Sequence, residues 1–207
     1  MRILDISPLI TEASPVYPGD APLSLSFVRS SQVCVGTLTM SAHLGAHVDA
    51  PQHLNRVGDV SEIALTELIG PCQVIERIGK KVITAEDLPS RLFARRVLIK
   101  TGFNRPCCWT NEFSYLSADA VAFLIEQGVK VIGIDTPSID PAEDERLPSH
   151  VLAIDAGILI LENLELSAVQ AGEYELIALP LKIKGLEASP VRAVLIDQRS
   201  GESGSCI

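Results

Sequence analysis

Three of the four histidines in the chain lie within the eleven residues HLGAHVDAPQH, from 43 to 53. With the aspartate between them they form the pattern H-x3-H-x-D-x3-H, made by His43, His47, Asp49 and His53. A lone histidine on an apolar strand is usually a satisfied core residue, but neutral imidazoles are also the commonest metal ligands. A carboxylate two residues from an imidazole supplies the charge that a divalent cation needs. The clustering therefore favours a metal site.

The spacing of His43 and His47 requires either a bend or one helical turn in the backbone between them. In an extended strand they would lie about 13 Å apart, at roughly 3.3 Å per residue, which is too far to share one ion. Gly45 lies midway and has the backbone freedom for such a bend. Beyond it, His47 and Asp49 are an i, i+2 pair whose side chains leave a strand on the same face.

The last histidine of the segment, His53, is suited to proton transfer. Three protein ligands leave a divalent metal with an open position for water, as in catalytic sites, where the pKa of that water falls to about 7. If the first two histidines and Asp49 are the ligands, His53 is spare. Pro51 ends any helix before it and stiffens the approach. We expect His53 to act as general base towards water and then as general acid towards the leaving amine.

The fourth histidine, His150, precedes an apolar strand in which Glu162 is an acid among leucine and isoleucine. A carboxylate in that position is costly to bury unless it is paired or coordinated. The two residues could supply a second metal, with Asp49 bridging. Taken alone, a surface-loop histidine and a strand-end glutamate are the simpler interpretation.

The segments that must position these residues are mostly short, apolar strands. Strands are predicted over 95–101, 129–136, 156–164, 174–183 and 191–197. A helix is predicted over 117–128, with Ser117 as its N-cap, and a shorter one over 85–92 after Thr84. The helix at 117 runs directly into a strand, which is an α/β unit. We expect an α/β fold rich in strands, with two sheets or a mixed, barrel-like sheet flanked by a few helices.

Length and charge exclude several classes of protein. The 207 residues predict a single domain over 1–207, without an apolar run long enough for a membrane span. The opening MRILDISPLI lacks the features of a signal peptide, so we expect a cytoplasmic location. Seventeen basic and twenty-six acidic residues give a net charge of −9, which argues against nucleic acid and anionic membranes as partners.

The cysteines form an odd set without CxxC spacing: Cys34, Cys72, Cys107, Cys108 and Cys206. Nothing before them indicates export to an oxidising compartment, so free thiols are expected. Adjacent cysteines make a strained disulfide, which favours an ordinary structural role for the pair at 107 and 108 over a redox or metal element.

Several blocks together resemble the cyclase family of metal-dependent hydrolases, and within it the bacterial kynurenine formamidases. HLGAHVDAPQH is similar to the signature HxGxHxDxPxH, and VYPGD (16–20) to an N-terminal VWPGD. GIDTPSIDP, ILENL and YELIALPLKIKGLEASPVRAVL are similar to blocks of the second half. The resemblance runs from residue 5 to about residue 195, nearly the whole chain.

The resemblance implies an enzyme that hydrolyses N-formyl-L-kynurenine to L-kynurenine and formate, a step of tryptophan degradation. It implies one zinc on His43, His47 and Asp49, and a second zinc on Asp49, His150 and Glu162. Manganese is the alternative metal. His53 matches the proton-transfer histidine of the family. The implied fold is a strand-rich α/β domain, usually a homodimer.

Three positions depart from the family pattern, and none of them removes a ligand. VYPGD fits a type II turn, by itself a surface turn, with Tyr17 at one end. Tyr17 stands where the family has a tryptophan that touches the substrate, and its smaller ring can still stack on an aryl group. Ala46 replaces a threonine and Leu54 an aromatic residue.

Two rival functions follow from the same residues. One is a hydrolase of another aryl or cyclic amide, similar to isatin hydrolase, with unchanged site chemistry. The other is a protein that binds metal without catalysis. The intact His53 argues against the second, because a purely structural site gains nothing from a spare proton-transfer group beside an open coordination position.

Overall fold

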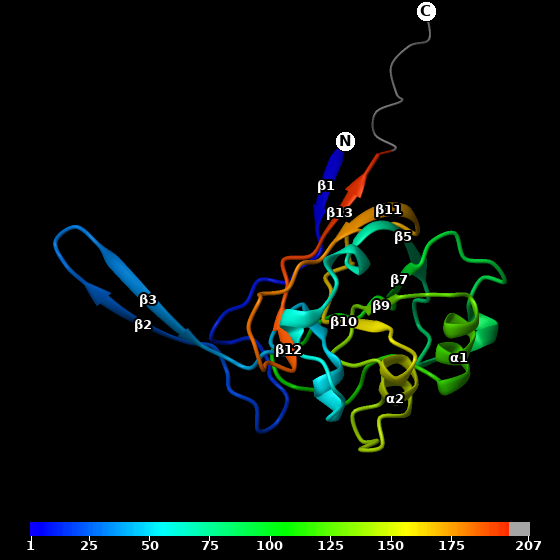
Figure 1. The fold of residues 1–207 in the computed structure, drawn as a ribbon, viewed down its shortest axis with the longest axis horizontal. Helices are drawn as coiled ribbons and strands as arrows, with labels where there is room; N and C mark the ends of the chain where they lie inside the picture. Colours follow the sequence, from blue (N-terminus) through cyan, green and yellow to red (C-terminus); the bar gives the residue numbers. More distant parts are fainter. Residues whose placement is uncertain (199–207) are drawn as a thin grey trace, which may run out of the picture.

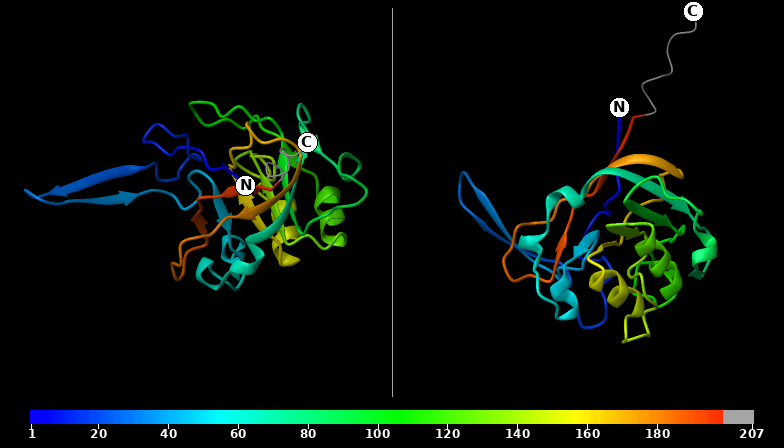
Figure 2. Two further views of the ribbon diagram at one scale, coloured as in Figure 1. Left: turned by 90° about the horizontal axis from the view of Figure 1, so that it is seen from above. Right: turned by 45° about the vertical axis from the view of Figure 1, so that its right-hand side comes forward.

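The computed structural model describes residues 1–198 of the chain. Within them a nine-stranded mixed sheet with the order β1-β13-β11-β5-β7-β9-β10-β4-β12 curls into part of a barrel (Figures 1 and 2). Its strands are β1 (Arg2–Asp5), β4 (His47–Asp49), β5 (Ile69–Glu76), β7 (Arg96–Lys100), β9 (Val131–Ile134), β10 (Leu159–Glu162), β11 (Gly172–Ile177), β12 (Ala188–Pro190) and β13 (Val194–Asp197). The predicted strand-rich fold with a mixed, barrel-like sheet is confirmed. That residues 1–207 form a single domain stays a prediction.

Strands β5, β7, β9 and β10 are parallel and form the middle of the sheet, and antiparallel strands extend it on both sides. Helices α1 (Ala118–Glu126) and α2 (Pro148–Asp155) cover one face (Figure 1). The 3-10 turns are η1 (Pro51–Leu54), η2 (Val60–Glu62), η3 (Leu65–Glu67) and η4 (Ala85–Asp87), and β6 (Val82–Ile83) pairs with β8 (Tyr115–Leu116). Among residues 1–198 there is no helix of the length and apolarity needed to cross a membrane.

The sheet separates two apolar cores because side chains alternate along each strand. On β7, Val97 and Ile99 pack under the helices, while Leu98 lies in the core on the other face. Gly133 of β9 faces this second core, where a Cβ atom would lie 2.3 Å from a methyl carbon of Leu98. A larger residue would therefore collide with the Leu98 and Leu164 side chains.

Some predicted elements differ from the observed ones. The helix predicted over 117–128 is α1, although the Ser117 hydroxyl donates to the Ile83 carbonyl instead of capping the helix. The helix predicted over 85–92 is wrong, since only the turn η4 forms there. The strand predicted over 174–183 ends at Ile177. Free thiols are confirmed at Cys34, Cys72, Cys107 and Cys108, and Cys206 lies outside the described residues.

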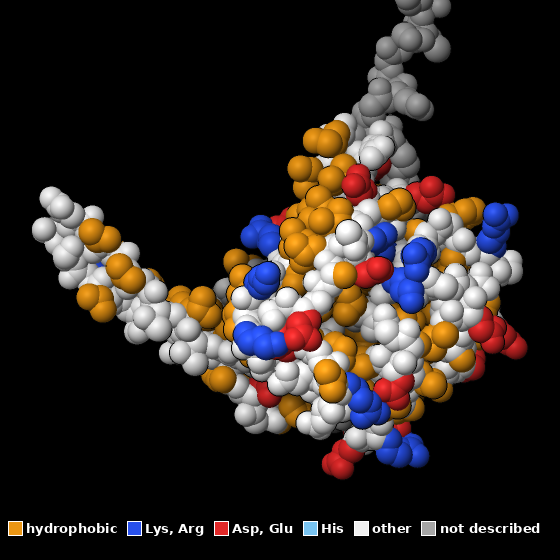
Figure 3. Space-filling model, viewed as in Figure 1, with side chains coloured by type: hydrophobic (Ala, Val, Ile, Leu, Met, Phe, Trp, Pro, Cys, Tyr) orange, Lys and Arg blue, Asp and Glu red, His pale blue; other side chains and the backbone are white. Residues whose placement is uncertain are grey.

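A hairpin formed by β2 (Ser24–Arg29) and β3 (Cys34–Thr39) extends away from the rest of the molecule (Figure 1). All twelve strand residues are exposed. The pairing register places Leu25, Phe27 and Leu38 on one face. The other face carries Ser24, Ser26, Thr37 and Thr39, with Val28 and Val35 near the tip. Apolar side chains are visible along this arm in Figure 3.

Candidate metal centre

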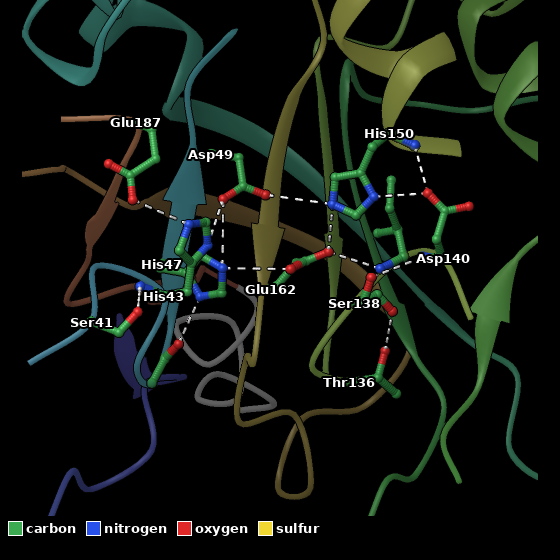
Figure 4. A network of polar contacts seen from close by, with 12 residues as sticks. Ser41, His43, His47, Asp49, Thr136, Ser138, Asp140, His150, Glu162 and Glu187 are labelled. Carbon is green, nitrogen blue, oxygen red and sulfur yellow. Dashed lines mark hydrogen bonds and ion pairs between the residues drawn. The ribbon is translucent and has the colours of Figure 1, made fainter. Parts of the chain in front are cut away.

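Strand β4 carries two of the predicted ligands and places them beside a third. His47 and Asp49 flank the core residue Val48, so their side chains leave β4 on the face opposite to the Val48 side chain. In the antiparallel pairing of β4 with β10, His47 lies directly across from Glu162. The His47 Nε2 atom is 3.5 Å from Glu162 Oε2 and 3.6 Å from Asp49 Oδ1 (Figure 4).

The predicted bend before β4 occurs at Gly45. Its φ is 76°, and a Cβ atom there would lie 2.6 Å from Ile10 Cδ1, so both backbone conformation and space require glycine. The bend returns His43 to the cluster, with its Nδ1 atom 3.2 Å from Asp49 Oδ1. On the other side of the ring, His43 Nε2 is 3.5 Å from Glu187 Oε1.

His53 reaches the cluster from the turn η1. Strand β4 precedes Pro51, so there is no helix for it to end, and Pro51 is instead the first residue of this turn, where its fixed φ is favourable. The centroid of the half-buried His53 ring is 4.5 Å from that of His43 and 5.8 Å from that of His150. The spare histidine of the sequence pattern therefore lies beside the other imidazoles.

His150 lies on helix α2, and the surface-loop interpretation is wrong because the residue is buried. Its Nε2 atom is 3.2 Å from Glu162 Oε1 and 3.7 Å from Asp49 Oδ2. Asp140 holds the other side of the residue, since one carboxylate oxygen lies 2.8 Å from both the Nδ1 atom and the backbone nitrogen of His150. The structure thus brings the distant His150 to the same carboxylates as β4.

Two groups of ligand atoms lie close enough to share an ion. The atoms within each group are all within 4.8 Å of one another, and the groups are His43, Asp49 and His53, and His47, Asp49 and Glu162. Asp49 belongs to both. The resemblance divides the same side chains differently, because it joins His47 to His43 and keeps His53 for proton transfer.

Buried polar atoms at the centre of the cluster have no hydrogen-bond partner among the described residues. They are His47 Nε2 and both carboxylate oxygens of Asp49, a residue that is 1% exposed. The carboxylate of Asp135, also buried, instead accepts hydrogen bonds from Thr101 and Gly102. An unsatisfied buried carboxylate is costly, and a cation between these atoms removes that cost. The donor set therefore fits a divalent metal ion.

Three imidazoles at the centre have an acceptor on their outer nitrogen. His47 Nδ1 lies 2.9 Å from the Gly45 carbonyl oxygen, and His150 Nδ1 lies 2.8 Å from Asp140. The Nε2 atom of His43 lies beside the Glu187 carboxylate. Outer acceptors of this kind fix the tautomer and leave a lone pair on the nitrogen that faces the metal.

Burial and neighbouring charges shift the pKa values of the cluster. Burial lowers the pKa of the His53 imidazole, and the nearby His43 and His150 rings reinforce that shift against the attraction of Asp49. Burial opposes ionisation of Asp49, but the imidazoles of His150 and His43 outweigh it and hold its pKa well below the usual range. Burial also disfavours a charge on His43, yet Asp49 raises its pKa to about 9. His53 is thus the ring best suited to be a neutral base.

Backbone strain is concentrated around the same cluster. Within residues 1–198, the non-glycine residues with positive φ are Asn55 (55°), Leu147 (47°) and Asn163 (57°). Asn55 ends η1, Leu147 precedes α2 and Asn163 follows Glu162, so each adjoins an element that carries a site residue. The left-handed conformation costs a residue such as leucine about 1–2 kcal/mol, and such costs persist mainly at functional sites.

A cavity of about 580 Å³ opens onto the histidine cluster. All four histidines and Glu162 contribute to its lining. Aromatic side chains of the 102–114 segment line it as well: Phe103, Trp109 and Phe113. The pocket therefore offers an aryl compound an apolar wall together with the polar cluster.

The segment VYPGD forms the predicted type II turn at the pocket. The Asp20 N–H donates to the Tyr17 carbonyl at 2.9 Å, and Gly19 has a φ of 102°. Tyr17 is 52% exposed, and its ring meets Trp109 edge to face with centroids 5.1 Å apart. Trp109, which comes from another segment, thus lies beside Tyr17, the position at which the family resemblance implies a tryptophan.

Comparison with known proteins identifies the family. The Cyclase family model matches residues 4–141 of the chain. The chain belongs to the cyclase family. This member of the cyclase family is also 42% identical, over 207 residues, to the kynurenine formamidase of Delftia acidovorans. The alignment covers 94% of this chain and 97% of that protein.

Solved structures agree with this cyclase fold. A structure described as a potential metal-dependent hydrolase with cyclase activity has a TM-score of 0.82 and 29% identity, with 95% of this chain and 99% of that chain covered. Isatin hydrolase A from Labrenzia aggregata has a TM-score of 0.78 and 23% identity, with 94% and 93% covered, and at that identity it shows the fold alone.

Three residues of the site are absent from the sequence predictions. Asp140 and Glu187 lie in blocks that we used only for their family resemblance, although acids within apolar blocks were an available signal. Trp109 is the single tryptophan of the chain and follows the cysteine pair. Nothing in its local sequence indicates that it reaches Tyr17.

Proposed function

We propose that this protein is a metal-dependent arylformamidase that hydrolyses N-formyl-L-kynurenine to L-kynurenine and formate, in the cytoplasmic degradation of tryptophan. The observation that carries the proposal is the buried Asp49 carboxylate, which is shared by two ligand groups and lacks hydrogen-bond partners among the described residues. The imidazoles around it line a pocket that also has aromatic walls. The identity to a kynurenine formamidase, which extends over nearly the whole chain, supports this substrate.

The residues that would hold the metal are the ones predicted from the sequence: His43, His47, Asp49, His150 and Glu162. We propose zinc, with two ions that share Asp49, and manganese as the alternative. Bound zinc supplies Lewis acidity, which polarises an amide carbonyl and acidifies water near neutral pH. Asp140 and Glu187 would hold two of the imidazoles in orientation from outside.

His53 would move the proton during the reaction. Its lowered pKa keeps the imidazole neutral near pH 7, so that it can take a proton from the attacking water. The resulting imidazolium then protonates the aniline nitrogen of the substrate as the bond from that nitrogen to the formyl carbon breaks. The neighbouring His43 and His150 rings favour this transfer, because they disfavour a lasting positive charge on His53.

The test of the proposal is the hydrolysis of N-formyl-L-kynurenine, followed through the absorbance of released kynurenine. Fast turnover is expected, with loss after chelation and recovery when zinc is restored. Isatin is assayed in parallel. Hydrolysis of isatin alone would overturn the formamidase assignment in favour of the isatin-hydrolase-like activity, and no turnover of either compound by metal-loaded protein would overturn both.

The β2–β3 hairpin supports a homodimer as the working form. A two-stranded hairpin is at best marginally stable in water without a further surface to cover its apolar face. Here Leu25, Phe27 and Leu38 share one face and are exposed. Each arm of a twofold dimer would place this face against the partner chain.

Replacing Leu38 by glutamate is expected to break this dimer. Burying a charge in place of leucine on both arms should raise the dissociation constant by at least about a hundredfold. Light scattering after size exclusion measures the mass. The matched control is Thr37→Glu, which adds the same charge on the opposite face and should leave the dimer intact. A monomeric wild-type protein, or equal effects of both variants, would contradict this prediction.

A further inference from the structure

Acidic side chains outnumber lysine and arginine side chains in the lining of the cavity. Among the described residues that line it, Arg105 is the only lysine or arginine. The acids in the lining, besides Glu162 of the metal centre, are Asp20, Asp144, Glu145 and Glu187. Apart from the imidazoles of the metal centre, an anionic substrate group therefore meets one guanidinium among acidic side chains, while an ammonium group has several carboxylates available.

The Arg105 side chain is partly buried and held in place beside the metal centre. Its Nη2 atom donates to the Asn163 carbonyl at 3.1 Å, and its Nη1 atom lies 3.2 Å from Glu165 Oε2. Asn163 directly follows Glu162. These contacts use part of the donor set of a guanidinium, whose planar fork suits a carboxylate.

Arg105 also belongs to the segment that forms the aromatic wall. Phe103, Trp109 and Phe113 come from the same 102–114 segment and line the same cavity. The rings of Trp109 and Phe113 are 6.2 Å apart and edge to face. One segment thus supplies an apolar surface for an aryl ring and a cation a few residues away.

We propose that Arg105 binds the α-carboxylate of an amino-acid substrate and selects such substrates over neutral aryl amides. This inference rests on the proposed function, because N-formyl-L-kynurenine has an aryl ring, a formamide and an amino-acid head. Arg105 is a substrate-binding residue for the carboxylate and takes no part in breaking the amide bond. Isatin, which has no carboxylate, gains nothing from it.

The test combines one protein change with two changes of substrate. Wild type and Arg105→Gln are assayed with N-formyl-L-kynurenine, with its methyl ester and with formanilide. In the wild type, kcat/KM should fall about 10- to 100-fold from acid to ester, the range expected for loss of a charge-assisted bidentate contact. Arg105→Gln should hydrolyse the acid as poorly as wild type hydrolyses the ester, with the loss mainly in KM. Its activity on formanilide should stay within about twofold of wild type.

Controls separate binding from folding and from the proposed function. Arg192→Gln removes one positive charge from an exposed arginine that pairs with Asp5, a residue that does not line the cavity, and should change none of the ratios. A parallel loss on all three compounds in Arg105→Gln would show a structural role through Asn163 and Glu165, and would overturn the proposal. Because the ester comparison needs only wild-type protein, equal kcat/KM for acid and ester overturns it even if Arg105→Gln does not fold. If wild type hydrolyses formanilide but not N-formyl-L-kynurenine, the proposed function fails together with this inference.

Discussion

Replacing His53 by alanine is expected to lower kcat for N-formyl-L-kynurenine by about 10²- to 10⁴-fold while the metal stays bound. The imidazole is half-buried beside the His43 and His150 rings, and its lowered pKa suits a neutral base. No other neutral imidazole is available among the described residues, because the remaining three would hold metal. Steady-state turnover and metal content are measured on the same preparation.

The metal content of the His53 variant decides between two roles. The structure groups His53 with His43 and Asp49 as ligand atoms, whereas the family resemblance makes it the proton-transfer residue. Loss of metal together with activity would identify His53 as a ligand, and undiminished turnover with bound metal would exclude it from the chemistry. Gln52→Ala, an exposed neighbour on the same turn, is the control and should leave both quantities unchanged.

The dependence of kcat/KM on pH in the wild type should show the ionisation of His53. The base form of His53 is the neutral one, so kcat/KM falls as the pH drops through its pKa. Because burial lowers that pKa from 6.5, the acid limb should lie below pH 6.5. In His53→Ala this limb should disappear.

Replacing Asp49 by asparagine is expected to abolish metal binding and reduce turnover to background. The carboxylate belongs to both ligand groups, and its two buried oxygens have no hydrogen-bond partner among the described residues. Metal that binds the folded state at about 1,000 times its dissociation constant stabilises a protein by about 4 kcal/mol. Zinc should therefore raise the melting temperature of the wild type but not that of the variant, as thermal unfolding with and without zinc would show.

Asp135→Asn is the matched control for Asp49. Both aspartates are buried, but the Asp135 carboxylate accepts hydrogen bonds from Thr101 and Gly102. Its replacement should lower the melting temperature and leave the stabilisation by zinc intact. If Asp49→Asn retained a full complement of metal, a shared carboxylate at the centre of the site would be ruled out.

The central strands and the histidine segment could be predicted because their signals are local. Apolar runs rich in β-branched residues mark β7, β9 and β10, and the spacing of His47 and Asp49 puts them on one face of a strand. The bend at Gly45 followed from the distance that two ligands of one ion can span. These features depend on residues that are neighbours in sequence.

Other features depend on contacts that a local pattern does not reveal. Helix α2 is short and begins at Pro148 after Leu147 in the left-handed conformation, so its start has no cap that marks it in the sequence. The strand predicted over 174–183 stops at Ile177, and beyond it Pro180, which lacks an N–H for a continuous ladder, forms only an isolated antiparallel bridge with Val191. The β2–β3 hairpin did have a local signal that we did not use, namely the alternation of apolar and polar residues in LSLSFV (23–28).

Strand β1 pairs with β13 and with no other strand among the described residues, so residues 2–5 are held by residues 194–197. During synthesis the first strand therefore remains without its partner until residues 194–197 have left the ribosome. Strand β4 likewise remains unpaired until β10 and β12, which follow it in the sequence, have been synthesised. Contacts of such high sequence separation slow folding. The metal centre is thus among the last parts of the molecule to assemble, and a nascent chain released before β12 would lack one strand that holds it in place.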